Sequence, residues 1–263
     1  MESTIIAEAT SPRYTILILT LPGSERRLPL VSRLEAAGLA YRILEGVDGR
    51  KGLPSEYEKQ IDRDAAYRRL HREMGEAEFA CAISHLAAVR HIIDSNLPGA
   101  IILEDDAILS DDFLRLANDG YAEKAPMMVF YHRKGRAFRT QKAALFKHYF
   151  TAKIAINPEG SVAYAMNRET AEKYYSGCFP ISHPADWGCE LRELDAVLVT
   201  PCLVGHPEEQ ENHSFIEASR RESLVRSGGF YRGSPMTKFW TLFLPAYWRQ
   251  RWIKCVSTKD FDR

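Results

Sequence analysis

Cysteine is scarce in this sequence, and its spacing excludes two common roles. The five cysteines are an odd number, and no two of them are spaced as C-x-x-C. This argues against a disulfide framework and against a zinc site. We therefore expect a protein of a reducing compartment, of which the cytosol is the simplest.

Long apolar runs are also missing. Residues 1–12 contain Glu2 and Glu8 but neither a basic start nor an apolar core, so they do not resemble a signal peptide. The longest uncharged apolar run near the C-terminus, Phe239–Trp248, is too short to span a bilayer. The sequence predicts a cytoplasmic protein that is soluble or peripheral on the cytoplasmic face of the inner membrane.

The chain has no excess of charge and no dinucleotide fingerprint. Its 35 Lys and Arg balance its 35 Asp and Glu, so the net charge does not indicate a class of binding partner. No G-x-G-x-x-G follows the first predicted strand, which argues against a Rossmann dehydrogenase. A length of 263 residues with 45% hydrophobic residues fits one α/β domain with a helical appendage.

What the sequence contains is an alternation of strand-like and helix-like segments. An apolar, β-branched run at 14–19 predicts a buried strand, followed by a helix from about Leu28 to Gly38. Residues 76–95 carry one apolar stripe and predict the clearest helix. The pattern predicts an α/β fold with a mainly parallel sheet. The other expected elements are strands at 41–44, 100–103, 127–131, 161–166 and 196–200, a charged helical stretch at 56–74, and helices after Ser110 and at 167–175.

Three adjacent acids, Glu104, Asp105 and Asp106, follow the strand predicted at 100–103. Carboxylates this close repel one another unless a cation neutralises them, and open α/β sheets bind ligands at the carboxyl ends of strands. In an extended chain Glu104 and Asp106 would face one side and bind Mn²⁺ or Mg²⁺, while Asp105 would reach a ribose hydroxyl or backbone amides. The alternative is a solvated acidic turn before the next helix.

Several blocks surround these acids in a fixed order: S-E-R-R at 24–27, G-V-D-G at 46–49, E-F-A-C-A-I-S-H at 78–85, I-L-E-D-D at 102–106, G-S-V-A-Y at 160–164 and P-A-D at 184–186. This order resembles glycosyltransferase family 25, the lipooligosaccharide galactosyltransferase type, over roughly residues 14–215. The chain departs from the family at Thr20-Leu21-Pro22, where Asn is usual, and at Ala77 and Ala80, where Gly is frequent.

The resemblance implies a GT-A type fold, a Rossmann-like mixed central sheet flanked by helices. It also implies inverting transfer of a hexose from a nucleotide-diphospho-sugar, with UDP-galactose as the commonest donor and a lipopolysaccharide or lipooligosaccharide as acceptor. Glu104 and Asp106 would hold Mn²⁺ or Mg²⁺, and a late histidine, His213 or His206, would be a further ligand. The residues expected to bind the nucleotide-sugar are Arg26, Arg27, Asp48, Glu78, Ser84, His85, Asp105 and Tyr164.

Most of these residues also have a plain structural interpretation. The two arginines fit a solvated helix face, and Asp48 fits an Asp-Gly turn. His85 fits a buried core position, and Glu78, seven residues earlier on the same helical face, would brace it with a hydrogen bond. Asp186 is the candidate base that deprotonates the acceptor, with Trp187 stacking on a sugar; the alternative is that Asp186 caps a helix over 187–192.

Two basic, aromatic stretches complete the sequence. Residues 132–153 contain seven Lys and Arg and no acid, and would bind acceptor phosphates or form a mobile basic loop. Residues 220–254 contain eight Lys and Arg, one acid and three of the four tryptophans. This stretch fits an anionic membrane surface, or a pair of short helices packed on the domain. We expect a catalytic domain at 13–215 and a C-terminal helical segment at 216–263.

Two other functions fit the sequence. One is a nucleic-acid-binding module that uses the basic and aromatic stretch. No recognised nucleic-acid-binding motif surrounds that stretch, so we do not expect a nucleic-acid partner. A catalytically inactive scaffold that binds nucleotide-sugars is the other.

Overall fold

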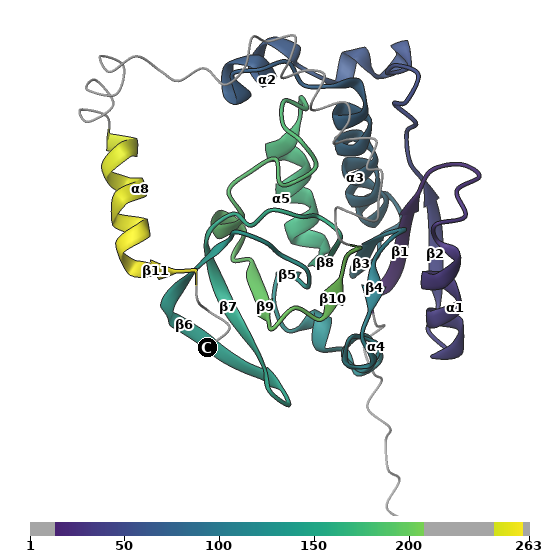
Figure 1. Ribbon diagram of the computed structural model, residues 1–263, viewed down its shortest axis with the longest axis vertical. Coiled ribbons are helices and arrows are strands. Elements are labelled where there is room, and N and C mark those ends of the chain that lie inside the picture. Colours follow the sequence, from purple (N-terminus) through teal and green to yellow (C-terminus); the bar gives the residue numbers. More distant parts are fainter. Residues whose placement is uncertain (1–13, 208–244, 260–263) are drawn as a thin grey trace, which may run out of the picture.

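The computed structural model describes residues 14–207 and 245–259. Within these ranges nine strands form one mixed sheet in the order β11-β6-β7-β9-β5-β8-β3-β1-β2 (Figure 1). The expected mixed α/β architecture with flanking helices is confirmed, and it is compatible with a GT-A-like fold. The prediction of a mainly parallel sheet is wrong, because only three of the eight strand pairs in this sheet are parallel and the strands from β6 onward enter mostly through antiparallel pairs. A second, two-stranded sheet pairs β4 with β10. The strands are β1 Thr15–Thr20, β2 Tyr41–Glu45, β3 Gly99–Glu104, β4 Ile108–Leu109, β5 Met127–Val129, β6 Arg136–Phe146, β7 Tyr149–Ile156, β8 Ala163–Asn167, β9 Val197–Thr200, β10 Val204–Gly205 and β11 Ser257–Thr258.

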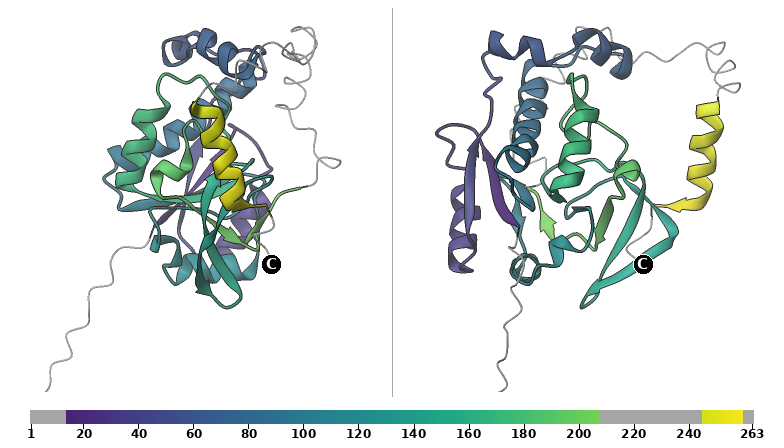
Figure 2. Two further views of the ribbon diagram at one scale, coloured as in Figure 1. Left: turned by 90° about the vertical axis from the view of Figure 1, so that its left-hand side faces the viewer. Right: turned by 180° about the vertical axis from the view of Figure 1, so that it is seen from behind.

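Helices cover both faces of the sheet because successive strand residues point to opposite sides. Leu17 and Ile102 pack into a core shared with α3 and α5, which lie side by side (Figures 1 and 2). Ile18 and Leu103 pack into a second core with α1 and α4. The helices are α1 Leu28–Ala36, α2 Arg63–Leu70, α3 Glu76–Asp94, α4 Asp111–Asn118, α5 Arg168–Cys178 and α8 Pro245–Val256, with 3₁₀ helices at Ser55–Gln60, Tyr121–Glu123 and Leu191–Leu194.

The first three strands bring their carboxyl ends to one edge of the sheet. β1 lies between β2 and β3 and pairs with both in parallel, with Thr20 opposite Glu45 and Leu19 opposite Glu104. The intervening helix α1 begins at Leu28, as expected, with Pro29 in its first turn, where the missing N–H has no intrahelical partner to lose. This β-α-β opening places three loops beside one another.

The charged stretch at 56–74 is not one helix, as the sequence suggested. A 3₁₀ helix at Ser55–Gln60 and α2 are separated at Ile61, which forms a bridge to Ile181. Asp62 then caps α2, its carboxylate accepting from the Ala65 N–H at 2.8 Å. The extended residue needed for the bridge interrupts the helix.

The basic stretch at 132–153 is not a loop. Most of it forms the antiparallel hairpin of β6 and β7, and β7 continues into the main sheet through β9. Residues Arg139 to Ala144 of β6 are all exposed, so both sides of the strand face solvent here. The strand was not predicted because these six consecutive residues are all exposed, so this part of β6 lacks the apolar alternation of a half-buried strand.

The C-terminal helix is attached to the sheet edge. α8 begins at Pro245 and leads into β11, which pairs with the start of β6. The rest of the C-terminal segment before Pro245 lies outside the described residues. Within the described ranges, no helix has the length and apolarity to cross a membrane.

Candidate functional site

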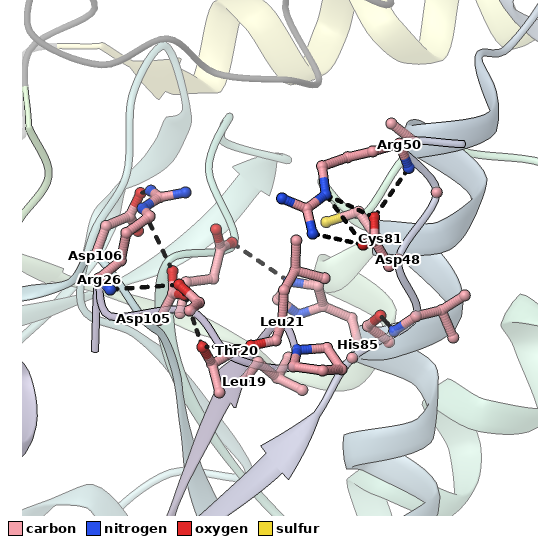
Figure 3. A pocket seen from close by; sticks show the side chains of 18 of the residues that line it. Leu19, Thr20, Leu21, Arg26, Asp48, Arg50, Cys81, His85, Asp105 and Asp106 are labelled. Carbon is pink, nitrogen blue, oxygen red and sulfur yellow. Dashed lines mark hydrogen bonds and ion pairs between the residues drawn. The ribbon is translucent and has the colours of Figure 1, made fainter. Parts of the chain in front are cut away.

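A cavity of about 380 Å³ opens where β1, β2 and β3 end. Its walls are the loops after these strands, the first half of α3 and His206. Figure 3 shows acidic and basic side chains from separate parts of the chain pointing toward one another around it. This is the edge at which open α/β sheets bind nucleotides and sugars.

The three acids at the end of β3 have different partners. The chain turns directly after Glu104, so the alternation expected for an extended segment does not continue. Asp105 accepts hydrogen bonds from Thr20 Oγ1 at 2.8 Å and Ser24 Oγ at 3.1 Å. This ties Asp105 to the loop after β1.

Asp106 is the acid that faces basic groups. Its Oδ2 accepts from the Arg26 guanidinium and lies 3.2 Å from His206 Nε2. Burial raises the pKa of Asp106, but the His206 hydrogen bond and the Arg26 charge outweigh it and hold that pKa below its usual value. The same hydrogen bond raises the pKa of His206. Arg26 also approaches Asp105, at 3.8 Å, so one guanidinium lies beside both aspartates.

Asp106 fits a metal ligand in one further respect. Its Oδ1 is buried and has no hydrogen-bond partner within the described ranges. No group of three His, Cys, Asp or Glu side chains able to hold a metal occurs in residues 14–207 and 245–259. Mg²⁺ is commonly held by one or two protein carboxylates, with the remaining positions taken by water and substrate phosphates. A metal held by Asp106 and His206 together with a diphosphate is consistent with this arrangement.

Glu104 points to a buried network on α3 and β8 instead. Its Oε1 accepts from Ser161 Oγ at 2.9 Å and lies 3.3 Å from His85 Nε2. His85 Nδ1 lies 3.1 Å from the Tyr164 hydroxyl. The expected common face of Glu104 and Asp106 is thus replaced by two separate environments, because the turn redirects Asp106.

The loop after β2 is held against α3. Ser84 Oγ accepts from the Val47 N–H at 2.8 Å and donates to Ala80 O at 2.7 Å. A Cβ on Gly49 would lie 2.7 Å from the Ala80 Cβ and 2.8 Å from Glu76 O, so only glycine fits there. Ser84 therefore shapes the cavity by positioning this loop.

Asp48 lies in the same loop and lines the cavity. Its carboxylate accepts from Arg50 Nε at 2.8 Å and Nη2 at 2.6 Å. These hydrogen bonds from Arg50 lower the pKa of Asp48 to about 2. A negative charge beside an arginine thus faces the cavity from the second strand.

Glu78 and Arg27 lie outside the cavity wall. The buried Glu78 carboxylate accepts from both terminal nitrogens of Arg72, at 2.6 and 2.7 Å, and from the Gly75 N–H at 3.0 Å. The expected brace between Glu78 and His85 is wrong, because Arg72 takes the carboxylate and His85 turns to Tyr164. Arg27 donates to Ser24 O in its own turn.

Asp186 is exposed and does not line the cavity directly. Its Oδ1 accepts from the Gly160 N–H at 3.2 Å. No helix covers 187–192: the next helical turn begins at Leu191, after Glu190, so the capping alternative is wrong. Burial, followed by the charges of Glu104 and Asp186, raises the pKa of the Cys81 thiol on the cavity wall.

Trp187 does not face solvent. It is 6% exposed and packs edge-on against Tyr164, with the ring centroids 5.2 Å apart. The expected stacking of this indole on a sugar is therefore wrong. Trp187 instead supports the Tyr164 and His85 side of the site.

The structure brings Arg26, Asp48, Ser84, His85 and the three acids together around the cavity. His213 lies outside the described residues, whereas His206, the other histidine considered, contacts Asp106. Sequence reasoning missed the contributions of Thr20, Ser24, Arg50, Cys81 and Ser161. Hydroxyl residues after a strand carry no local signal of a contact made about 80 residues away.

Comparison with known proteins adds a family match. The family described as glycosyltransferase family 25 (LPS biosynthesis protein) matches residues 14–186. Among solved structures, the chain is similar to one described as "Crystal Structure of A197 from STIV", with 15% identity, 76% of this chain and 87% of that chain covered, and a TM-score of 0.42. No curated protein matches the chain. The matched range contains every cavity residue except His206.

Proposed function

Because this chain belongs to glycosyltransferase family 25 and is thereby a glycosyltransferase of lipopolysaccharide biosynthesis, we propose that it transfers a hexose from a nucleotide-diphospho-sugar with inversion. The proposed donor is UDP-galactose, and the proposed acceptor is a lipopolysaccharide or lipooligosaccharide. The observation that carries the proposal is the cavity at the ends of β1, β2 and β3, where Arg26 and His206 surround Asp106.

The charges around the cavity suit a nucleoside diphosphate. Arg26 supplies a half-exposed guanidinium at the cavity wall, suited to a phosphate because its donors form a planar fork. Asp48, ionised because of Arg50, is placed to accept from the ribose or the base. Asp105 is committed to Thr20 and Ser24, so its role is to hold the loop that carries Arg26.

We propose that Asp106 and His206 hold Mn²⁺ or Mg²⁺ beside the diphosphate. The orphaned Asp106 Oδ1 and the adjacent imidazole are the donor atoms that support this assignment. When bound, such an ion would neutralise charge on the departing diphosphate. In the protein alone Arg26 lies against both aspartates, and on donor binding its half-exposed guanidinium would also reach the phosphates.

Asp186 is the proposed base. The acceptor hydroxyl oxygen bonds to the anomeric carbon while its proton passes to the Asp186 carboxylate. The bond from the anomeric carbon to the diphosphate breaks, and its electron pair leaves with the nucleoside diphosphate. Gly160, in the segment that leads to β8, donates its N–H to Asp186, and the charge of Asp186 also contributes to the raised pKa of Cys81 on the cavity wall.

The hairpin of β6 and β7 is the proposed binding surface for acidic groups of the acceptor. Arg139 and Lys142 are exposed on β6, and Lys142 Nζ lies 5.2 Å from the centre of the Phe150 ring. No acidic residue occurs between 132 and 153. Basic and aromatic side chains together suit phosphates carried on sugars.

A calorimetric screen of nucleotide-sugars with and without Mn²⁺ tests donor and metal together. We expect UDP-galactose to bind in the micromolar range and to bind more tightly with Mn²⁺. Binding of nucleotide-sugar without turnover on any acceptor would favour an inactive scaffold. Absence of binding by every nucleotide-sugar would contradict the proposal.

A further inference from the structure

The last helix presents two tryptophans to solvent. Trp248 is 58% exposed and Trp252, one turn later, is 63% exposed. Residues three and four positions apart share a helix face, so Arg251 and Cys255, both exposed, lie on this side as well. Ile253 faces the opposite way and is 3% exposed. We call Trp248, Arg251, Trp252 and Cys255 the indole face of α8.

This face is held at the sheet edge. Arg136 of β6 donates from Nη2 to Lys254 O at 3.0 Å and to Ser257 O at 2.8 Å, and from Nε to Ser257 Oγ at 2.9 Å. β11 continues the attachment by pairing with β6. Figure 1 shows α8 standing at the outer edge of the molecule beside β6. A fixed helix with exposed indoles is an interaction surface.

The charge of this helix indicates the kind of partner that it binds. Residues 245–259 contain Arg249, Arg251, Lys254 and Lys259 and no acid, although the whole chain is neutral. The Arg251 guanidinium lies 5.9 Å from the centre of the Trp248 ring. Tryptophan beside arginine and lysine suits the headgroup region of a bilayer rich in anionic lipid.

A second copy of this chain is a poorer partner. A two-fold contact through the indole face would bring Arg251 toward the same basic surface of the partner copy, where like charges repel. Nor does α8 suit a bilayer span, since its 12 residues are about 18 Å long against roughly 30 Å of hydrocarbon. We propose that α8 lies on an anionic phospholipid bilayer, with its indoles in the headgroup layer and Arg251 and Lys254 beside lipid phosphates.

Vesicle co-sedimentation tests this proposal. The full chain is mixed with vesicles of phosphatidylglycerol and phosphatidylethanolamine, or of phosphatidylcholine alone. We expect binding to the anionic vesicles, weakened by salt, and at least tenfold less to the neutral ones. The double variant Trp248→Ala, Trp252→Ala should bind anionic vesicles about tenfold less. Tyr67→Ala, which removes an aromatic side chain 54% exposed on α2, is the matched control and should bind normally.

A second variant keeps the test decisive if the double variant unfolds. Arg251→Glu retains both indoles and reverses one charge. We expect at least a tenfold loss, because the attraction of one basic side chain, about 1 kcal/mol at an anionic surface, is removed and the new carboxylate is repelled as well. Equal binding by wild type and Arg251→Glu, or no binding to anionic vesicles at low salt, would overturn the proposal. So would a dimer in light scattering that the double variant Trp248→Ala, Trp252→Ala abolishes.

Discussion

Glu104, Asp105 and Asp106 are neighbours in the chain, yet each meets a different group. Asp105 is bound by two hydroxyls, Asp106 faces Arg26 and His206, and Glu104 reaches Ser161 and His85. The sequence indicates that such a cluster needs a cation, and Arg26 supplies one. The sequence does not indicate which of the three acids keeps a carboxylate oxygen without a hydrogen-bond partner among the described residues, because that depends on the turn after Glu104.

Asp186 is assigned the chemical step, and its amide variant tests that role. Asp186→Asn keeps an oxygen for the Gly160 N–H but cannot take a proton, so kcat should fall by roughly 10²- to 10⁴-fold. The KM for the donor should change little, since Asp186 does not line the donor cavity. Steady-state kinetics against a soluble acceptor measure both, with Glu190→Gln, an exposed acid in the same segment, as control. An unchanged kcat would remove Asp186 from the mechanism.

Glu78 is assigned a structural role in place of the expected donor contact. Glu78→Ala leaves Arg72 without its partner, and breaking a buried ion pair costs about 3 kcal/mol. Chemical unfolding should show that loss, while the donor Kd of the folded variant stays the same. Glu56→Ala, an exposed acid, should alter neither quantity. A weaker donor Kd with unchanged stability would instead support a contact with the nucleotide-sugar.

At the level of elements, the loop after β2 depends on its contact with α3. Gly46 and Gly49 lie so close to Ser84, Ala80 and the α3 backbone that a methyl group fits at neither position. Ala80 stands where the family often has Gly, so the loop and the helix are already in tight contact here. The position of Asp48 in the cavity follows from this packing.

Gly49→Ala tests that packing. The added Cβ would lie 2.9 Å from Ala77 Cα and 2.8 Å from Glu76 O, and backbone atoms of a helix cannot move aside. We expect a loss of stability of about 1–3 kcal/mol from overpacking. Donor affinity should fall because Asp48 moves with the loop, as titration calorimetry would measure. Lys51→Ala, an exposed change nearby, is the control. Full retention of both stability and affinity would show that the loop adjusts freely.

Elements with long apolar patterns bounded by polar or turn residues were the ones predicted from sequence. β1, α3 and β3 were predicted to within a residue or two, because their apolar patterns are long and their ends carry polar or turn residues. The β6 and β7 hairpin was not, because its exposed residues conceal strand alternation. The break at Ile61 was also not predicted, because it depends on the bridge between Ile61 and Ile181, which is far along the chain.

In the whole molecule, the sheet assembles the site from three strand ends and one late segment. The contacts of Arg26 with Asp106 and of His85 with Tyr164 join residues about 80 positions apart. Local patterns therefore identified most members of the site but not their pairing. The family match ends at residue 186, so the contribution of His206 rests on the structure.

The central claim is that Asp106 acts on the diphosphate of a nucleotide-sugar at this edge of the sheet. The most direct measurement is the rate of UDP release from UDP-galactose with Mn²⁺ and with chelator, for wild type, Asp106→Ala and the control Asp111→Ala, an exposed acid outside the cavity. We predict that chelation and Asp106→Ala each lower the rate by about 100-fold or more, while Asp111→Ala does not. Metal-independent release, or full activity in Asp106→Ala, would contradict the account.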